Sequence, residues 1–401
     1  MPKPNFSAKL TDLNPSELRN VPASVRTESP GQKRGPSAGN DFYKAIRPFL
    51  IFGRIIGIVP LEGLGQKNHQ LLTFKRTSVK SIISLLIIIC LVFCVGVSLI
   101  CLVMLGNKTV TELVWATNPV IFFSMGLFGY SYMYWRNEVF RALLRKWHNS
   151  PLSVYTEDTS LKRDANLIFG IIFSSCILEN LLQQAIKLSL FDWLQIKMNG
   201  TKTELNPLQA YYNTTTQPNW SIIIPYNPVF SVVGFIWNKC ALYSWNFVDI
   251  FVILFARAMY FQFRAITSHT EQHVINRAAA TDGSIYSSSE MLTDYDKWQS
   301  VSRDFETLCS VLDDAKRFLS PMVFSSYAVN LFFVIIHLHM GLTPTEEFKN
   351  SAATELYRTW SFLHILCRLY LLSLFASRIH ESAEEFVELY RQCPSDCYSM
   401  K

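Results

Sequence analysis

Six long apolar segments separated by polar connections are the feature that most constrains the fold of this chain. The clearest segment runs from Ser81 to Leu105 and contains no charged residue. At a rise of about 1.5 Å per residue, a helix of this length exceeds the roughly 30 Å hydrocarbon core of a bilayer. Charged residues make up only 17% of the 401 residues, whereas a soluble domain carries about 25%. The sequence therefore predicts an all-α, polytopic membrane protein.

We expect the transmembrane bundle to cover 81–376, with spans at 81–105, 113–134, 165–186, 229–255, 319–342 and 360–376. Outside the bundle, 1–40 is polar and rich in Pro, Ser and Gly, which is typical of a disordered tail. In the region 41–80, residues 41–64 have apolar positions at helical spacing, broken by Pro48 and Pro60 and interrupted by three basic residues. This amphipathic segment should lie on the membrane surface or dock against the bundle.

The distribution of basic residues indicates which ends of the spans face the cytoplasm. Residues 1–80 hold 13 Lys/Arg against five Asp/Glu, and the 135–164 connection is also basic. By the positive-inside bias, we expect the amino terminus, the 263–318 loop and the tail at 377–401 to be cytoplasmic, and the 187–228 loop to be extracellular.

Glycosylation sequons give a second and independent indication of the same topology. Four sequons fall in connections that the charge bias places outside, at Asn107, Asn199, Asn213 and Asn219. We expect all four to be modified, and we place the protein in the plasma membrane as a multi-pass glycoprotein.

One cytoplasmic stretch does not look like an ordinary loop. Residues 300–318 carry apolar side chains at a spacing of three to four, which predicts a helix that continues into the fifth span and buries one face on a neighbour.

The sequence contains no set of residues typical of catalysis or metal binding. We find no phosphate-binding loop, nucleophile elbow or CxxC motif, and His337 and His339 are two residues apart, so a helix points them to different faces. We therefore expect neither enzymatic activity nor a cofactor. The basic excess belongs to a cytoplasmic membrane face and does not indicate nucleic-acid binding.

Polar residues inside two of the spans are the candidate binding site. The third span carries Glu179, Asn180 and Gln183 on one helical face, and the fourth carries Trp245 and Asp249 one turn apart. A charge at the bilayer centre costs about 2.5–3.5 kcal/mol even on lenient insertion scales, so we expect charged residues in the spans to have a structural or functional role. Carboxylates and amides can bond to the hydroxyls of a sugar while an indole face stacks on its C–H surface. Polar packing between helices explains the same residues equally well.

Four stretches together resemble the sugar-receptor branch of the insect gustatory receptors. They are FYKAIRPFLIFGRIIGIVPLEGL at 42–64, LYSWNFVDIFVILFARAMYFQF at 242–263, DFETLCSVLDDAKRFLSPMVFSSYAVNLFFVIIHL at 304–338 and LFASRIHESA at 374–383. The resemblance implies an insect chemoreceptor-type helical bundle and a sweet-taste receptor that is itself a ligand-gated, non-selective cation channel. It implies a homo- or hetero-tetramer with other gustatory receptors, each subunit holding a small sugar ligand.

The resemblance also assigns roles to residues. Glu179, Trp245 and Asp249 match positions that contact sugar in the family, whereas Asn180 stands where a His is usual, which leaves the sugar preference open. The family normally has seven transmembrane helices, and six are complete here. We expect a truncated form that binds sugar without conducting alone.

Two other classes remain as alternatives. A secondary transporter of small polar solutes would show inverted repeats and pairs of broken helices, and the sequence shows neither. A G-protein-coupled receptor would place the amino terminus outside, against the charge bias.

Overall fold

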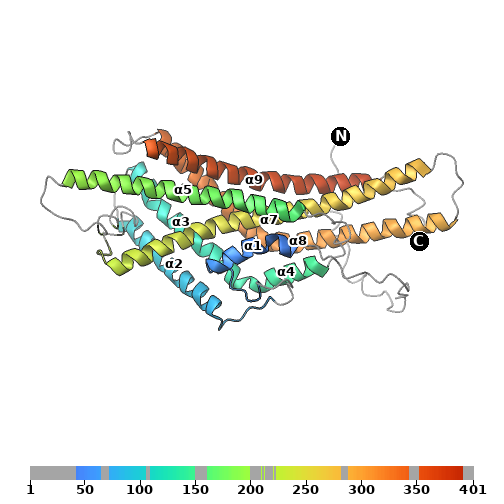
Figure 1. Cartoon of the computed structure of the whole chain (residues 1–401), viewed down its shortest axis with the longest axis horizontal. Coiled ribbons are helices and arrows are strands. Elements are labelled where there is room, and N and C mark those ends of the chain that lie inside the picture. The colour runs from blue at the N-terminus through green and yellow to red at the C-terminus, as the bar shows by residue number, and fades with distance from the viewer. Residues whose placement is uncertain are drawn as a thin grey trace. The chain divides into compact units, whose positions relative to one another are not determined.

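Helices account for nearly all of the chain that the structure, a computed structural model, describes. The described residues are 42–64, 72–104, 109–149, 160–198, 209, 212, 220, 223–280, 288–342 and 352–391, and they belong to one compact unit, Ala38–Lys401. With the labels of Figure 1, the helices are α1 (Phe42–Ile55), α2 (Val79–Met104), α3 (Val110–Trp135), α4 (Asn137–Asn149), α5 (Ser160–Met198), α7 (Pro228–Ala280), α8 (Ser288–Leu342) and α9 (Ala352–Tyr390).

Six of the described helices contain stretches long and apolar enough to cross a membrane. The stretches are Val79–Met104, Glu112–Trp135, Leu161–Ile186, Pro228–Gln272, Lys297–His339 and Thr354–Tyr390. Each predicted span overlaps a different one of them, so the prediction of an all-α, polytopic membrane protein is confirmed. The tail at 1–40 and the sequon residues Asn107, Asn199, Asn213 and Asn219 lie outside the described residues.

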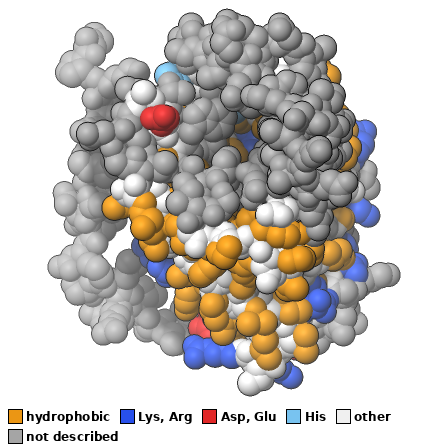
Figure 2. Space-filling view, turned by 90° about the vertical axis from the view of Figure 1, so that its left-hand side faces the viewer, with side chains coloured by type: hydrophobic (Ala, Val, Ile, Leu, Met, Phe, Trp, Pro, Cys, Tyr) orange, Lys and Arg blue, Asp and Glu red, His pale blue; other side chains and the backbone are white. Residues whose placement is uncertain are grey.

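The outward faces of the spans are apolar, as a lipid environment requires. In α2 the buried positions include Ser81, Ser84, Cys94 and Ser98, while Ile, Leu, Val and Phe side chains of the same helix are exposed. Small and weakly polar residues on the inward face let helices approach closely, and apolar side chains on the outward face meet lipid tails. Hydrophobic side chains accordingly cover much of the described surface in the lower half of Figure 2.

Helix α8 is longer than a membrane span, and it includes the helix predicted at 300–318. It runs without a break from Ser288 to Leu342, so that helix is continuous with the fifth span. Its predicted apolar face packs against α9, where the rings of Phe305 and Phe386 stack at 4.1 Å between centroids.

Helix α1 docks against the bundle, which is one of the two positions expected for it. Seven of its residues are buried, and it packs on α5 and α7. The expected break at Pro48 is wrong, because Pro48 lies inside the helix. A proline there removes one backbone hydrogen bond, and the burial of the surrounding face of α1 offsets this loss.

The short helix α4 was not expected, and the prediction of a loop at 135–164 is wrong for Asn137–Asn149. Its buried residues Phe140, Leu143, Leu144 and Trp147 have the i, i+3, i+4, i+7 spacing of an amphipathic helix. The basic residues between them obscured that pattern, and one of them, Lys146, donates to Ser310 Oγ at 2.9 Å and pairs with Asp314 on α8.

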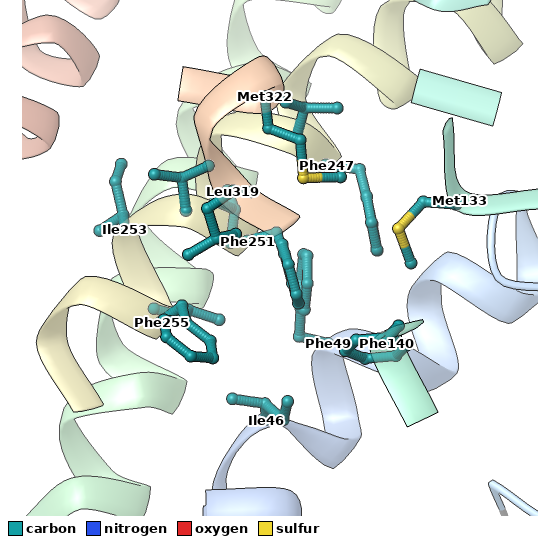
Figure 3. Close-up of a cluster of buried hydrophobic side chains, with 14 of the residues drawn as sticks. Ile46, Phe49, Met133, Phe140, Phe247, Phe251, Ile253, Phe255, Leu319 and Met322 are labelled. Carbon is teal, nitrogen blue, oxygen red and sulfur yellow. The ribbon is translucent and has the colours of Figure 1, made fainter. Parts of the chain in front are cut away.

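An aromatic core forms where α1, α4, α7 and α8 meet. Phe49 stacks on Phe247 with ring centroids 4.4 Å apart. Phe140 meets Phe251 edge-on, with centroids 5.5 Å apart, and stacks on Phe318 at 5.8 Å. Figure 3 shows Phe49, Phe140, Phe247 and Phe251 in this cluster, together with Leu319 and Met322 of α8. Burying such rings stabilises a fold by about 1.5–3 kcal/mol for each fully buried side chain in water-based measurements.

The backbones of helices α3 and α7 approach closely at Gly126. A Cβ atom added to Gly126 would lie 2.8 Å from the Cα atom of Ala241, which is closer than real Cβ contacts. The Ser244 hydroxyl, one turn along α7, donates to the Gly126 carbonyl at 3.0 Å. Glycine is therefore required here so that the two backbones can touch.

We predict that Gly126→Ala lowers the free energy of unfolding by about 1–3 kcal/mol, because the new methyl group forces α3 away from α7. The matched control is Gly96→Ala, whose added Cβ meets nothing within 4 Å. Thermal unfolding of the purified protein in detergent measures both. Equal midpoints for the two variants would contradict this account of the helix crossing.

Candidate functional site

A row of polar side chains follows one face of α9. Tyr357, Ser361, His364 and Arg368 are spaced four, three and four residues apart, which places them on a single face over about 16 Å. Ser361, His364 and Arg368 are all at least 95% buried. This face meets α5, α7 and α8, and every polar residue predicted as a binding residue lies on α5 or α7.

Arg368 forms a fully buried ion pair with Asp249 on α7. Arg368 Nε donates to Asp249 Oδ2 at 2.7 Å, and the terminal guanidinium nitrogen contacts the same oxygen. Asn330 Nδ2 donates to that oxygen at 3.1 Å, and the Ser326 hydroxyl donates to Oδ1. Both carboxylate oxygens are thus satisfied, and one side chain joins α7, α8 and α9.

Trp245 lies one turn from Asp249, and two side chains pack against its ring. Phe333 of α8 stacks on it at 4.7 Å, and the Arg368 guanidinium lies 4.4 Å from the ring centroid. Because these groups lie against the indole and Trp245 is only 6% exposed, its ring is not open for a sugar to stack on. Its indole N–H is buried and has no hydrogen-bond partner in the described part of the chain.

Glu179 on α5 faces the middle of the α9 row. The Ser361 hydroxyl donates to its Oε1 at 2.5 Å, and its Oε2 lies 3.8 Å from His364 Nε2. The other ring nitrogen of His364 is 2.7 Å from the Ser175 hydroxyl, and His337 Nε2 on α8 is 3.1 Å from Ser361 Oγ. The carboxylate is therefore part of a polar network that joins α5, α8 and α9.

Asn180 and Gln183 connect the same face of α5 to its neighbours. The Lys239 ammonium on α7 donates to Asn180 Oδ1 at 2.6 Å. Gln183 lies close to the Tyr357 side chain of α9. All five predicted residues therefore contribute to one polar cluster between α5, α7, α8 and α9, in two groups centred on Glu179 and Asp249.

Three buried polar atoms in this cluster have no hydrogen-bond partner among the described residues. They are Trp245 Nε1, Asn330 Oδ1 and His364 Nε2, one from each of α7, α8 and α9. A buried polar group without a partner costs about 1–3 kcal/mol. Asn330 contacts Asp249, and His364 lies near Glu179, so each polar group of the cluster has an unpartnered atom as a neighbour.

Several residues of the cluster were absent from the predicted set. Arg368 lies within the predicted span 360–376, and Lys239 lies within 229–255. A charge inside an apolar span was the signal that would have identified both. Ser326, Asn330 and Ser361 gave no such signal, because hydroxyls and amides are common in helix interfaces. No group of three or more metal-binding side chains occurs among the residues that the structure describes.

The chain is similar in sequence to several insect proteins. It is 20% identical to the Drosophila melanogaster gustatory receptor for sugar taste 64a, over 98% of this chain and 86% of the relative. It is 22% identical to gustatory receptor for sugar taste 61a, over 90% and 78%, and 21% identical to gustatory receptor 5a for trehalose, over 95% and 80%, both from the same species.

Among solved structures, the insect olfactory receptor OR5 from Machilis hrabei matches with a TM-score of 0.45 and 15% identity, over 89% of this chain and 85% of that one. The model of the trehalose receptor family matches residues 26–401, which is most of the chain. These relatives are receptors and not enzymes, in agreement with the expectation from the sequence. The chain is a multi-pass membrane protein that belongs to the trehalose receptor family.

Proposed function

We propose that this protein is a gustatory receptor subunit that binds a sugar in the polar cluster of α5, α7, α8 and α9. The observation that carries the proposal is the set of unpartnered buried atoms at Trp245, Asn330 and His364, of which His364 Nε2 lies 3.8 Å from the Glu179 carboxylate. Three relatives are named for sugar taste or trehalose, which supports the same ligand class.

The chemistry of the cluster suits a ligand with many hydroxyl groups. Glu179 accepts hydrogen bonds, His364 offers its second ring nitrogen, and the Trp245 indole N–H donates. A sugar hydroxyl both donates and accepts, so neighbouring hydroxyls can satisfy an acceptor on α5 and a donor on α7 together. Because the ring of Trp245 is not open to a sugar, its contribution is the N–H edge and not the stacking expected from the sequence.

Asp249 plays a different part from Glu179. It already accepts from Arg368, Ser326 and Asn330, so it has no free oxygen in this arrangement. Its role is to fix α7 against α8 and α9, and thereby to hold the indole of Trp245 in place. Glu179, Asn180 and Gln183 on α5 are then the groups most open to exchange their present partners for a ligand.

The ligand acts on a ligand-gated, non-selective cation channel in the plasma membrane. The sugar bridges α5 to α7 and α9, and the receptor opens because the open arrangement binds the sugar more tightly than the closed one. The protein assembles as a homotetramer, or as a heterotetramer with other gustatory receptors. The lipid bilayer surrounds the apolar outer faces of its helices.

We predict that Glu179→Gln weakens trehalose binding by roughly tenfold or more, because hydrogen bonds to a charged group contribute about 1.5–3 kcal/mol. Binding of labelled trehalose to the purified protein in lipid nanodiscs measures the effect. The control is Glu384→Gln, an exposed residue of α9 that pairs with His380. Identical binding curves for wild type and Glu179→Gln would remove Glu179 from the site.

We predict that Arg368→Met lowers the free energy of unfolding by about 3–5 kcal/mol, because Asp249 is left buried without its partner. Combining it with Asp249→Asn should cost clearly less than the sum of the single changes. The control is Arg163→Met, an 82% exposed arginine 4.0 Å from Asp164, for which we expect under about 1 kcal/mol. Thermal unfolding measures all four variants, and strict additivity would contradict the pairing.

Co-expression with another sugar-taste receptor separates a channel from a secondary transporter. We predict that trehalose evokes a non-selective cation current in such cells without accumulation of labelled trehalose. Cells expressing the partner alone are the control. Accumulation of trehalose with no current would favour the transporter.

A further inference from the structure

Lys239 stands out as a cation placed inside a membrane span. It lies on α7, eleven residues after the helix begins, and its side chain is partly buried. Its ammonium donates to Asn180 Oδ1 at 2.6 Å and lies 4.9 Å from the centroid of the Phe235 ring. Both neighbours are uncharged, and the ammonium can donate two further hydrogen bonds.

The ammonium has no carboxylate partner within ion-pair distance in the described part of the chain. Glu179 is next to Asn180 in sequence, yet its oxygens face Ser361 and His364. The other basic residue of the cluster, Arg368, is fully neutralised by Asp249. A charge in a span is costly unless it has a partner, and it therefore points to a ligand.

We propose that Lys239 is a specificity-determining residue that binds the carboxylate of a sugar acid, an inference that rests on the proposed sugar site. The hydroxyl groups of such a ligand bond to Glu179 and His364, while its carboxylate accepts from the Lys239 ammonium. Asn180 positions the ammonium by accepting one of its hydrogen bonds. Glu179 repels a carboxylate at its own end of the site, so the acid group is directed to the Lys239 end.

Two matched ligand pairs test the proposal on the whole chain in nanodiscs. Each pair differs only in oxidation of one C6 hydroxymethyl group to a carboxylate: glucose with glucuronate, and trehalose with its monouronic acid. We expect the acid of at least one pair to bind about tenfold more tightly than its neutral partner, because charge-assisted hydrogen bonds are about twice as strong as neutral ones. The advantage should shrink as ionic strength rises.

Two variants remove the advantage in different ways. Lys239→Met keeps the length of the side chain and deletes its charge. Asn180→Asp keeps the ammonium and gives it an internal carboxylate at the position of the present 2.6 Å contact. Both should reduce the ratio of acid to neutral affinity to about one or below, and the second remains informative if the first does not fold. The control is Lys316→Met, an exposed lysine paired with Asp313.

The outcomes separate this inference from the proposed function. Binding of neutral sugars with no preference for either acid overturns the role of Lys239 and leaves the sugar site intact. A preference for the acid that persists in folded Lys239→Met or Asn180→Asp also overturns the role of Lys239. Absence of all sugar binding overturns both, whereas Lys239-dependent binding of acids alone supports this inference and contradicts a site for neutral sugars.

Discussion

The ion pair between Asp249 and Arg368 is the interaction on which the arrangement of the candidate site depends. It joins α7 to α9 where the side chains are 0% and 2% exposed, and Ser326 and Asn330 bring α8 to the same carboxylate. The hydrophobic effect drives little association between helices surrounded by lipid, so a satisfied polar contact of this kind fixes their relative position. The same guanidinium lies over the Trp245 ring, so the ion pair also helps to hold the indole in place.

Two kinds of packing divide the bundle. Aromatic rings from α1, α4, α7 and α8 form an apolar core around Phe251, whereas hydroxyls, amides and charges gather between α5, α7, α8 and α9. Helix α7 contributes to both, since Phe247 faces the aromatic core and Trp245 and Asp249 face the polar cluster. Close packing makes the apolar side rigid. Under the proposed function, a ligand exchanges hydrogen-bond partners on the polar side, and α7 is the helix that joins this side to the aromatic core.

The spans and the helical class could be predicted from the sequence because a run such as 81–105 has only one physical explanation. Glu179, Asn180, Gln183, Trp245 and Asp249 could be named for a similar reason, since polar groups in apolar runs are rare. The partners of these residues could not be predicted, because Arg368 is more than 100 positions from Asp249 and the pairing depends on how α9 lies against α7. Helix α4 was missed because basic residues interrupt its apolar positions. The covering of Trp245 by Phe333 is a tertiary contact with no local signal.

We propose that a sugar binds between α5 and α9 while the Asp249–Arg368 pair holds the surrounding helices. An experimental structure of the chain in nanodiscs with bound trehalose tests it most directly. We expect ligand density within hydrogen-bonding distance of Glu179 and His364, with Asp249 still paired to Arg368. Density for the sugar at any other place, with the polar cluster unchanged and empty, would contradict it.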